Sequence, residues 1–479
     1  MSRRTVVAIV WAWIVLLTVT HFGARSPYSY GWAMFDHDSA RISGAVVNPD
    51  ALLIANVTRF FYDASPLNWG SQEAENLRLP LHSFTTAMLM SFTRSFLLAN
   101  VLVNVLFAML VALAAVNLAE RYRIRREATL VALLTFFALP MYVEYLGQPL
   151  HYVAGISVSF LVVMSVVALV VAGDDARYAA LAIAILSLNY DPYVYIAALV
   201  VLFGRRLKWS LLLAAMPVAV WAITLRVLSG NTMTTHLRKW FVLPVLSGWV
   251  DFFMAPLDRI LLPFVATHVG LQVAFHQLIA MIYWPLLAVC VFLLVKLRPK
   301  LELRVVALLP LFFVLEQLAA AAFDWELNPR RAIPAVLAFA FAYLYAMDRE
   351  WQRWRIAFIA LFLMSGLLAM SDTLFGKPAI AYLHTGQAIR HDVHDIVRAE
   401  RMRLDTDSLP RLTRDEPITW RDVDRAKAQN LGTFAVTQTM GVLLLFGLFW
   451  LTARAELLPR WLPWAAVAMW AVSLVRFVS

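Results

Sequence analysis

Long apolar stretches recur along the whole chain, separated by short connectors that carry most of its arginine and lysine residues. A helix of about 20 apolar residues is long enough to cross the hydrocarbon core of a bilayer. We therefore predict an all-α fold, a polytopic transmembrane helical bundle of about 11–13 spans. The predicted spans lie roughly at 5–22, 95–118, 127–146, 152–172, 208–228, 270–295, 304–323, 332–347, 355–371, 433–452 and 461–478.

The connectors between the apolar stretches predict the direction of each span. Cytoplasmic connectors of membrane proteins carry an excess of lysine and arginine. The basic connectors near residues 3–4, 121–126, 205–208, 296–304 and 349–355 are therefore predicted to be cytoplasmic. The connectors at 147–151, 229–259 and 324–331 alternate with them and are predicted to face the opposite side.

The apolar stretch at 178–203 departs from this pattern because the sequence Asn189-Tyr190-Asp191-Pro192 interrupts it. Each half is too short for an ordinary crossing, and both flanks have cytoplasmic character. We expect a pair of short helices with Asp191 and Pro192 at the turn. The alternative is one long kinked span, which would invert every span that follows.

Three regions do not have the pattern of membrane spans. Residues 23–84 form a first outer loop, and residues 229–259 form a second, rich in aromatic residues, that is predicted to lie in the interface plane. Residues 373–432 form a charged extracytoplasmic segment. The predicted organisation is a transmembrane catalytic module at 1–372, this soluble segment at 373–432 and a C-terminal transmembrane hairpin at 433–479.

Composition excludes most other protein classes. The 479 residues are 61% hydrophobic and 15% charged, and the mean hydropathy is +0.70, which no soluble globular protein of this size matches. The net charge of +10 resides mostly in the connectors, so it does not indicate nucleic-acid binding. The single cysteine, Cys290, lies within an apolar run and excludes a disulfide framework.

An acidic motif follows the first span at the start of the outer loop. Asp36 and Asp38, separated by one residue, can share a divalent cation such as Mg²⁺ or Mn²⁺, or one can act as a general base. Arg41 follows three residues later. The alternative is a solvated loop in which an aspartate caps a short helix.

Basic residues on the predicted outer side are the second candidate group. Arg330 and Arg331 lie in a short outer connector, against the usual charge bias, and can clamp a phosphate or pyrophosphate. Pairing with neighbouring carboxylates or lipid headgroups is the alternative. Arg238 and Lys239 precede the aromatic stretch and are candidates for lipid or phosphate binding.

Other ionisable or polar residues lie near the predicted outer ends of spans, where such groups are costly and often functional. Each also has an ordinary interfacial interpretation. The candidates for substrate binding are Arg78, His82, Glu144, His151, Tyr190 and Asp191.

These features together resemble the GT-C class of integral membrane glycosyltransferases. The resemblance is carried by Phe35-Asp36-His37-Asp38-Ser39-Ala40-Arg41, by Leu79-Pro80-Leu81-His82 and by Leu188-Asn189-Tyr190-Asp191. An acidic pair followed by arginine, and then an Arg-x-Pro-Leu-like stretch, is similar to bacterial glucosyltransferases that modify O-antigen on lipopolysaccharide. Here the acidic spacing is Asp-x-Asp-x-x-Arg rather than the Asp-Asp-x-x-Arg style of that subgroup.

The resemblance implies transfer of a hexose from a polyprenyl-phosphate donor to an extracytoplasmic glycan, lipid or protein acceptor. It implies a multi-pass protein of the bacterial inner membrane, surrounded by membrane lipids, with the active site facing the periplasm. Asp36 or Asp38 would deprotonate the acceptor hydroxyl, and Arg330 and Arg331 would stabilise the departing phosphate. The rivals are a lipid or glycolipid transporter or flippase, a scaffolding subunit of an envelope assembly, and an O-antigen ligase or polymerase.

Overall fold

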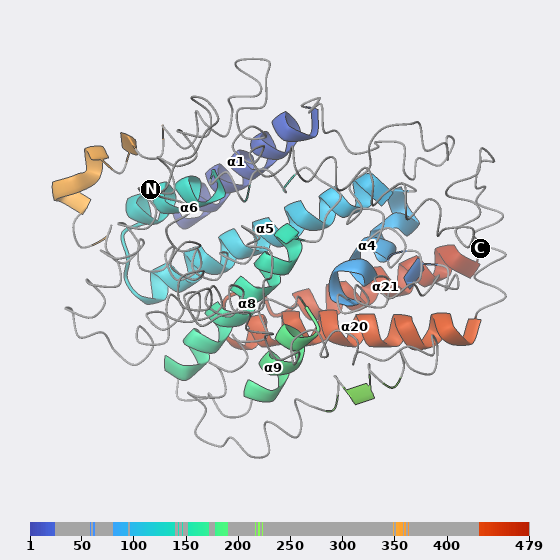
Figure 1. Cartoon of the computed structure of the whole chain (residues 1–479). Coiled ribbons are helices and arrows are strands. Elements are labelled where there is room, and N and C mark those ends of the chain that lie inside the picture. The colour runs from blue at the N-terminus through green and yellow to red at the C-terminus, as the bar shows by residue number, and fades with distance from the viewer. Residues whose placement is uncertain are drawn as a thin grey trace, which may run out of the picture. The chain divides into compact units, whose positions relative to one another are not determined.

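The computed structural model describes residues 1–23, 80–93, 96–138, 152–171, 178–189 and 431–478, together with short runs and single positions between 58 and 363. All regular secondary structure in this described part is helical (Figure 1). The predicted all-α class is therefore confirmed for these residues.

Most described helices coincide with predicted spans. The helices are α1 (Arg3–Gly23), α4 (Pro80–Thr93), α5 (Phe96–Arg121), α6 (Arg126–Phe137), α8 (Tyr152–Val171), α9 (Ala179–Ser187), α20 (Leu431–Arg454) and α21 (Leu462–Val478). Helices α1, α5, α8, α20 and α21 match the spans predicted at 5–22, 95–118, 152–172, 433–452 and 461–478. Helix α4 has no counterpart among the predicted spans, and its first residues belong to the segment assigned to the first outer loop. The predicted spans from 208 to 371 lie almost entirely outside the described residues.

Helix α6 is shorter than the span predicted at 127–146. It ends at Phe137, and Ala138 follows as its C-cap with its N–H bonded to the carbonyl of Leu134 at 3.2 Å. Pro140 comes two residues later in the sequence. Proline cannot donate a backbone hydrogen bond and disfavours helical geometry in the residue before it, so the helix ends ahead of it.

Two helices in the described part are long and apolar enough to cross a membrane, at Leu98–Arg121 in α5 and Ala435–Arg454 in α20. Shorter apolar helices lie at Val153–Val166 and Leu462–Val475. The total of about 11–13 spans stays a prediction from the sequence.

The chain divides into two compact units. Unit 1 comprises Met1–Thr20, Leu118–Glu144 and Leu237–Ile389, and unit 2 comprises the remaining segments His21–Asn117, Tyr145–His236 and Arg390–Ser479. In unit 1, α1 packs on α6, where the indole nitrogen of Trp13 donates to the carbonyl of Leu134 at 3.1 Å. The rings of Phe136, Phe137 and Tyr142 pack on one another with centroids 5.1–5.3 Å apart.

Helix α20 is the central element of unit 2. It packs against α4, α8, α9 and α21, and α8 also packs against α9 (Figure 1). The rings of Phe107 in α5 and Phe449 in α20 lie 6.5 Å apart. Gly441 of α20 lies directly against the ring of Phe84 in α4, so close that no side chain fits between them.

Contacts in unit 2 define two ends of its helices. At the Arg454 end, the Asn117 amide nitrogen donates to the carbonyl of Leu457 at 2.6 Å, and the ring of Tyr178 contacts Trp450 and Arg454. The Asn189 end comprises His82, Asn100, Asn104, Asn189 and the first turns of α8. The two ends are about 20 Å apart along α5, because Asn104 and Asn117 are separated by 13 residues of helix.

Hydroxyl side chains inside these apolar helices bond to their own backbone. Thr85, Ser159 and Ser165 donate to the carbonyls four residues earlier at 2.7, 3.0 and 2.6 Å. Such bonds satisfy a buried hydroxyl without a partner from another helix. They explain how serine and threonine are accommodated at positions with almost no exposure.

Candidate functional site

Of the residues predicted to form a site, the structure describes His82. The other predicted residues lie outside the described part of the chain: Asp36, Asp38, Arg41, Arg78, Glu144, His151, Tyr190, Asp191, Arg238, Lys239, Arg330 and Arg331. Several described helices begin or end next to these residues in the sequence, and their ends form the surroundings of the candidate site.

His82 lies in the first turn of α4, which Pro80 begins, and proline suits that position because the first helical N–H has no partner inside the helix. The imidazole is 3% exposed. Helix α4, which carries this histidine, is not among the helices long and apolar enough to cross a membrane, nor among the shorter apolar helices. Burial lowers the pKa of His82 from 6.5 to about 3, and the nearby amide side chain of Asn100 opposes this shift only in part. The ring is therefore neutral at physiological pH.

Two asparagines of α5 continue this polar contact toward α8. Asn100 and Asn104 are both fully buried and stand four residues apart, which places them on the same face of the helix. The Asn104 side-chain oxygen accepts a hydrogen bond from the N–H of Ala154 at 3.2 Å. That N–H belongs to the first turn of α8 and has no partner within the helix.

Asn189 closes the polar contacts on the other side of α8. Its amide nitrogen donates to the carbonyl of Gly155 at 2.7 Å and to the hydroxyl of Ser159 at 3.1 Å. Helix α9 has already ended at Ser187, with Leu188 as its C-cap. The end of α9 is therefore held against the beginning of α8 by a side chain that is 1% exposed.

Two hydroxyl groups within α4 and the hydroxyl of Thr58 have no hydrogen-bond partner among the described residues. Thr58, Ser83 and Thr86 have side-chain oxygens that are buried, and no residue in the described part of the chain accepts from or donates to them. Leaving a buried polar group unsatisfied costs about 1–3 kcal/mol. Hydroxyls in such positions are suited to bind water or the hydroxyl groups of a ligand.

Phe61, in the segment before α4, contacts both α4 and α20. The amide nitrogen of Gln438 donates to the carbonyl of Phe61, and the Gln438 oxygen accepts from the indole nitrogen of Trp470 at 3.2 Å. The rings of Phe61 and Phe84 meet edge to face with centroids 6.5 Å apart. Phe84 lies two residues after His82, so this contact places Phe61 against the beginning of α4.

Asn100, Asn104 and Gln438 were not among the residues predicted from the sequence to form a site. The signal was present, because Asn100 and Asn104 stand four residues apart in an otherwise apolar run. Asparagine at that spacing indicates a polar stripe on one helix face. Asn189 was noted as part of the interruption after α9 but was not assigned a contact.

The described residues of the Asn189 end offer amides, hydroxyls and one neutral imidazole. These groups donate and accept hydrogen bonds without carrying charge, so they are suited to bind hydroxyl groups. Within the described ranges, no three His, Cys, Asp or Glu side chains gather closely enough to hold a metal ion.

Comparisons with profiles of known protein families, with curated protein sequences and with solved structures found no match to this chain.

Proposed function

We propose that this chain is an integral membrane glycosyltransferase that moves a hexose from a polyprenyl-phosphate donor to an extracytoplasmic glycan, lipid or protein. The reaction would occur at the Asn189 end of unit 2. The bond from Asn189 to the carbonyl of Gly155 at 2.7 Å carries this proposal. It joins the end of α9, which Tyr190 and Asp191 follow in the sequence, to the start of α8, which His151 precedes.

The contacts agree with the direction of the helices that the basic connectors predict. The sequence assigns the beginnings of α5 and α8 and the end of α9 to the outer side, and bonds join all three at the Asn189 end. The connector after α20 is assigned to the cytoplasm and contacts the C-terminal part of α5 through Asn117. This agreement supports an outward-facing site and an extracytoplasmic position for residues 373–432.

Exposed apolar side chains support a membrane location. Leu443 of α20 is 60% exposed and Val475 of α21 is 66% exposed, and both lie on helices whose other faces are packed. Large apolar side chains gathered on the outside of a helical unit suit contact with lipid tails.

The proposed chemistry assigns a role to each predicted group. Asp36 or Asp38 would take the proton of the acceptor hydroxyl, with or without a divalent cation. Arg330 and Arg331, with Arg78, would stabilise the negative charge on the departing polyprenyl phosphate. The uncharged groups around α4 would hold the hydroxyls of the hexose, and the first outer loop would exclude water, which competes as an acceptor.

The direct test is the glycan content of cells that express the chain. Mass spectrometry of lipopolysaccharide, membrane lipids and membrane proteins should reveal one added hexose on a single acceptor class. The double variant Asp36→Asn, Asp38→Asn should abolish this addition while its abundance in the membrane stays unchanged. Unaltered transfer by the double variant would overturn the proposed enzyme mechanism.

One observation favours a transporter or flippase as the second candidate. Helix α9 stops inside the packed unit, and a buried asparagine follows, which is the kind of interrupted helix that transporters use near a substrate. Vesicles that contain the purified chain, a fluorescent polyprenyl phosphate and no acceptor distinguish the two. Rapid movement of the lipid between leaflets, unaffected by the Asp36→Asn, Asp38→Asn double variant, would establish the transporter.

A further inference from the structure

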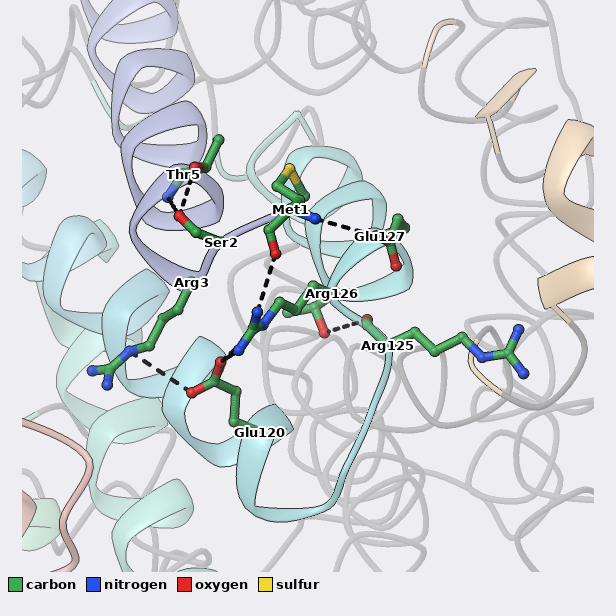
Figure 2. Close-up of polar contacts among 9 residues, drawn as sticks. Met1, Ser2, Arg3, Thr5, Glu120, Arg125, Arg126 and Glu127 are labelled. Carbon is green, nitrogen blue, oxygen red and sulfur yellow. Dashed lines mark hydrogen bonds and ion pairs between the residues drawn. The ribbon is translucent and has the colours of Figure 1, made fainter.

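A group of exposed arginines in unit 1 has more positive charge than its neighbouring carboxylates neutralise. Arg3 of α1 and Arg126 of α6 both pair with Glu120, with nitrogen–oxygen distances of 3.9 and 2.8 Å (Figure 2). The N-terminal amine lies 4.0 Å from Glu127, and the carbonyl of Met1 accepts from Arg126 at 3.1 Å. Two guanidinium groups therefore share one carboxylate.

Further arginines extend this charge. Arg125 pairs with Asp348 at 3.8 Å, and its guanidinium points away from Glu120 (Figure 2). Arg4 and Arg123 are exposed and take part in no ion pair with any residue of the described part. We call Arg3, Arg4, Arg123, Arg125 and Arg126 the arginine surface.

Arg123 occupies a backbone conformation that usually selects glycine. Its φ angle is 57°, in the left-handed region. The N–H of Ile124 bonds to the carbonyl of Ala119 at 2.9 Å and that of Arg123 to the carbonyl of Glu120 at 3.0 Å, the two bonds that close a helix with a left-handed residue. An arginine here is strained relative to glycine, and local strain of this kind often accompanies function.

The arginine surface lies directly beyond a candidate span. The span in α5 ends at Arg121, so Arg123, Arg125 and Arg126 follow within one or two turns of chain. Asp348, which pairs with Arg125, precedes a short helical run. In this run the ring of Trp354 is 48% exposed, and the guanidinium of Arg353 lies over it, 5.3 Å from the ring centroid. Tryptophan with neighbouring arginine is typical of the boundary between lipid tails and headgroups.

We propose that the arginine surface is a binding site for the headgroups of anionic phospholipids in the cytoplasmic leaflet. A phosphodiester presents two oxygens in a plane that a guanidinium group binds with two hydrogen bonds. The position at the end of a span and the excess of positive charge favour a headgroup held in a bilayer over an anion free in solution. This site is separate from the proposed transfer of hexose, in which no residue of the arginine surface has a role.

The chain supplies a matched control for Arg123. Glu456 follows α20 with a φ of 59°, and the N–H of Leu457 bonds to the carbonyl of Thr452 at 3.0 Å, so α20 closes as α5 does. Glu456 is exposed and pairs with Arg460 at 3.7 Å. Arg123→Gly and Glu456→Gly therefore relieve the same backbone strain, and only the first removes a cation from the arginine surface.

The test is a binding titration with the purified full chain in detergent micelles. Phosphatidylglycerol should bind the unaltered protein and the Glu456→Gly variant equally, and phosphatidylcholine should bind neither. Arg123→Gly and Arg123→Gln should both weaken phosphatidylglycerol binding by about fivefold, as expected for the loss of one phosphate contact. The glutamine variant keeps the strain, so agreement between the two assigns the effect to charge.

Two outcomes would overturn this proposal. One is unchanged phosphatidylglycerol binding in both Arg123 variants. The other is displacement of phosphatidylglycerol by inorganic phosphate at equal concentration, which would make the surface a site for a soluble anion. Neither outcome bears on hexose transfer, so failure here is distinguishable from failure of the proposed enzyme.

Discussion

Asparagine side chains join the helices of unit 2 at both of its described ends. Asn189 and Asn104 bond to backbone groups of the first turns of α8, and Asn117 bonds to the turn after α20. The N–H of Ala154 and the carbonyl of Leu457 lie at helix ends, where a backbone group without a partner inside the helix needs such a bond in an apolar environment. A single residue type therefore connects the helices at the proposed active end and at the opposite end.

The neutral state of His82 has a measurable effect on stability. Because burial lowers the pKa of the folded state to about 3, below the ordinary 6.5, the unfolded chain binds a proton that the folded chain excludes. Stability is fully present above pH 6.5 and falls at lower pH, by at most about 1.4 kcal/mol per pH unit. Thermal unfolding in detergent at about pH 7.5 and 5.5 should show a larger fall for the unaltered protein than for His82→Gln. An identical fall in both would contradict a buried, neutral His82.

At the scale of elements, glycines in α20 determine how closely its neighbours pack. A Cβ added at Gly441 collides with the ring of Phe84, whereas one added at Gly447 lies 3.0 Å from a terminal methyl of Leu181, which can rotate away. Gly441→Ala should therefore destabilise the protein by about 1–3 kcal/mol because α4 must shift. Gly447→Ala should cost less or be neutral, since alanine also favours the helix. Equal thermal midpoints for the two variants would contradict the close approach of α4 and α20.

Helix positions could be predicted from the sequence where the apolar run alone determines the element. The ranges of α1, α5, α8, α20 and α21 follow from length and hydropathy, because a long apolar helix needs no information about its neighbours. Helix α6 ends earlier than predicted because Pro140 disfavours helical geometry in the residue before it, although the apolar run continues past it. Helix α4 was missed because His82 and its neighbouring hydroxyl residues resemble a loop in sequence, and only packing buries them.

The candidate site could be predicted only in part. Of the candidate site residues, the described part contains His82, which is 3% exposed, and the others stay predictions. The contacts of Asn100, Asn104 and Asn189 depend on which helices are neighbours, and no periodicity within one segment contains that information.

At the scale of the whole molecule, the direction of the helices predicts which positions face the outside. In a variant with Cys290→Ser, cysteines introduced at Ser39, Ser229 or Ser408 should react with a membrane-impermeant maleimide in intact cells. A cysteine at Arg460 in the turn after α20 should react only after the membrane is opened. Labelling of the Arg460→Cys variant in intact cells would reverse the predicted direction of α20 and α21.

The proposed function assigns the reaction to one end of unit 2, and the two asparagines test this assignment directly. Asn189→Ala and Asn117→Ala each remove a side-chain bond to a backbone carbonyl between elements, at 2.7 and 2.6 Å, so both should lower the thermal midpoint. Asn189→Ala also removes the bond to Ser159, so its midpoint should fall further. Hexose addition to the acceptor, measured by mass spectrometry at equal protein abundance, should fall about tenfold or more in Asn189→Ala and stay within about twofold in Asn117→Ala. An equal loss of transfer in both variants, or a loss only in Asn117→Ala, would contradict an active site at the Asn189 end.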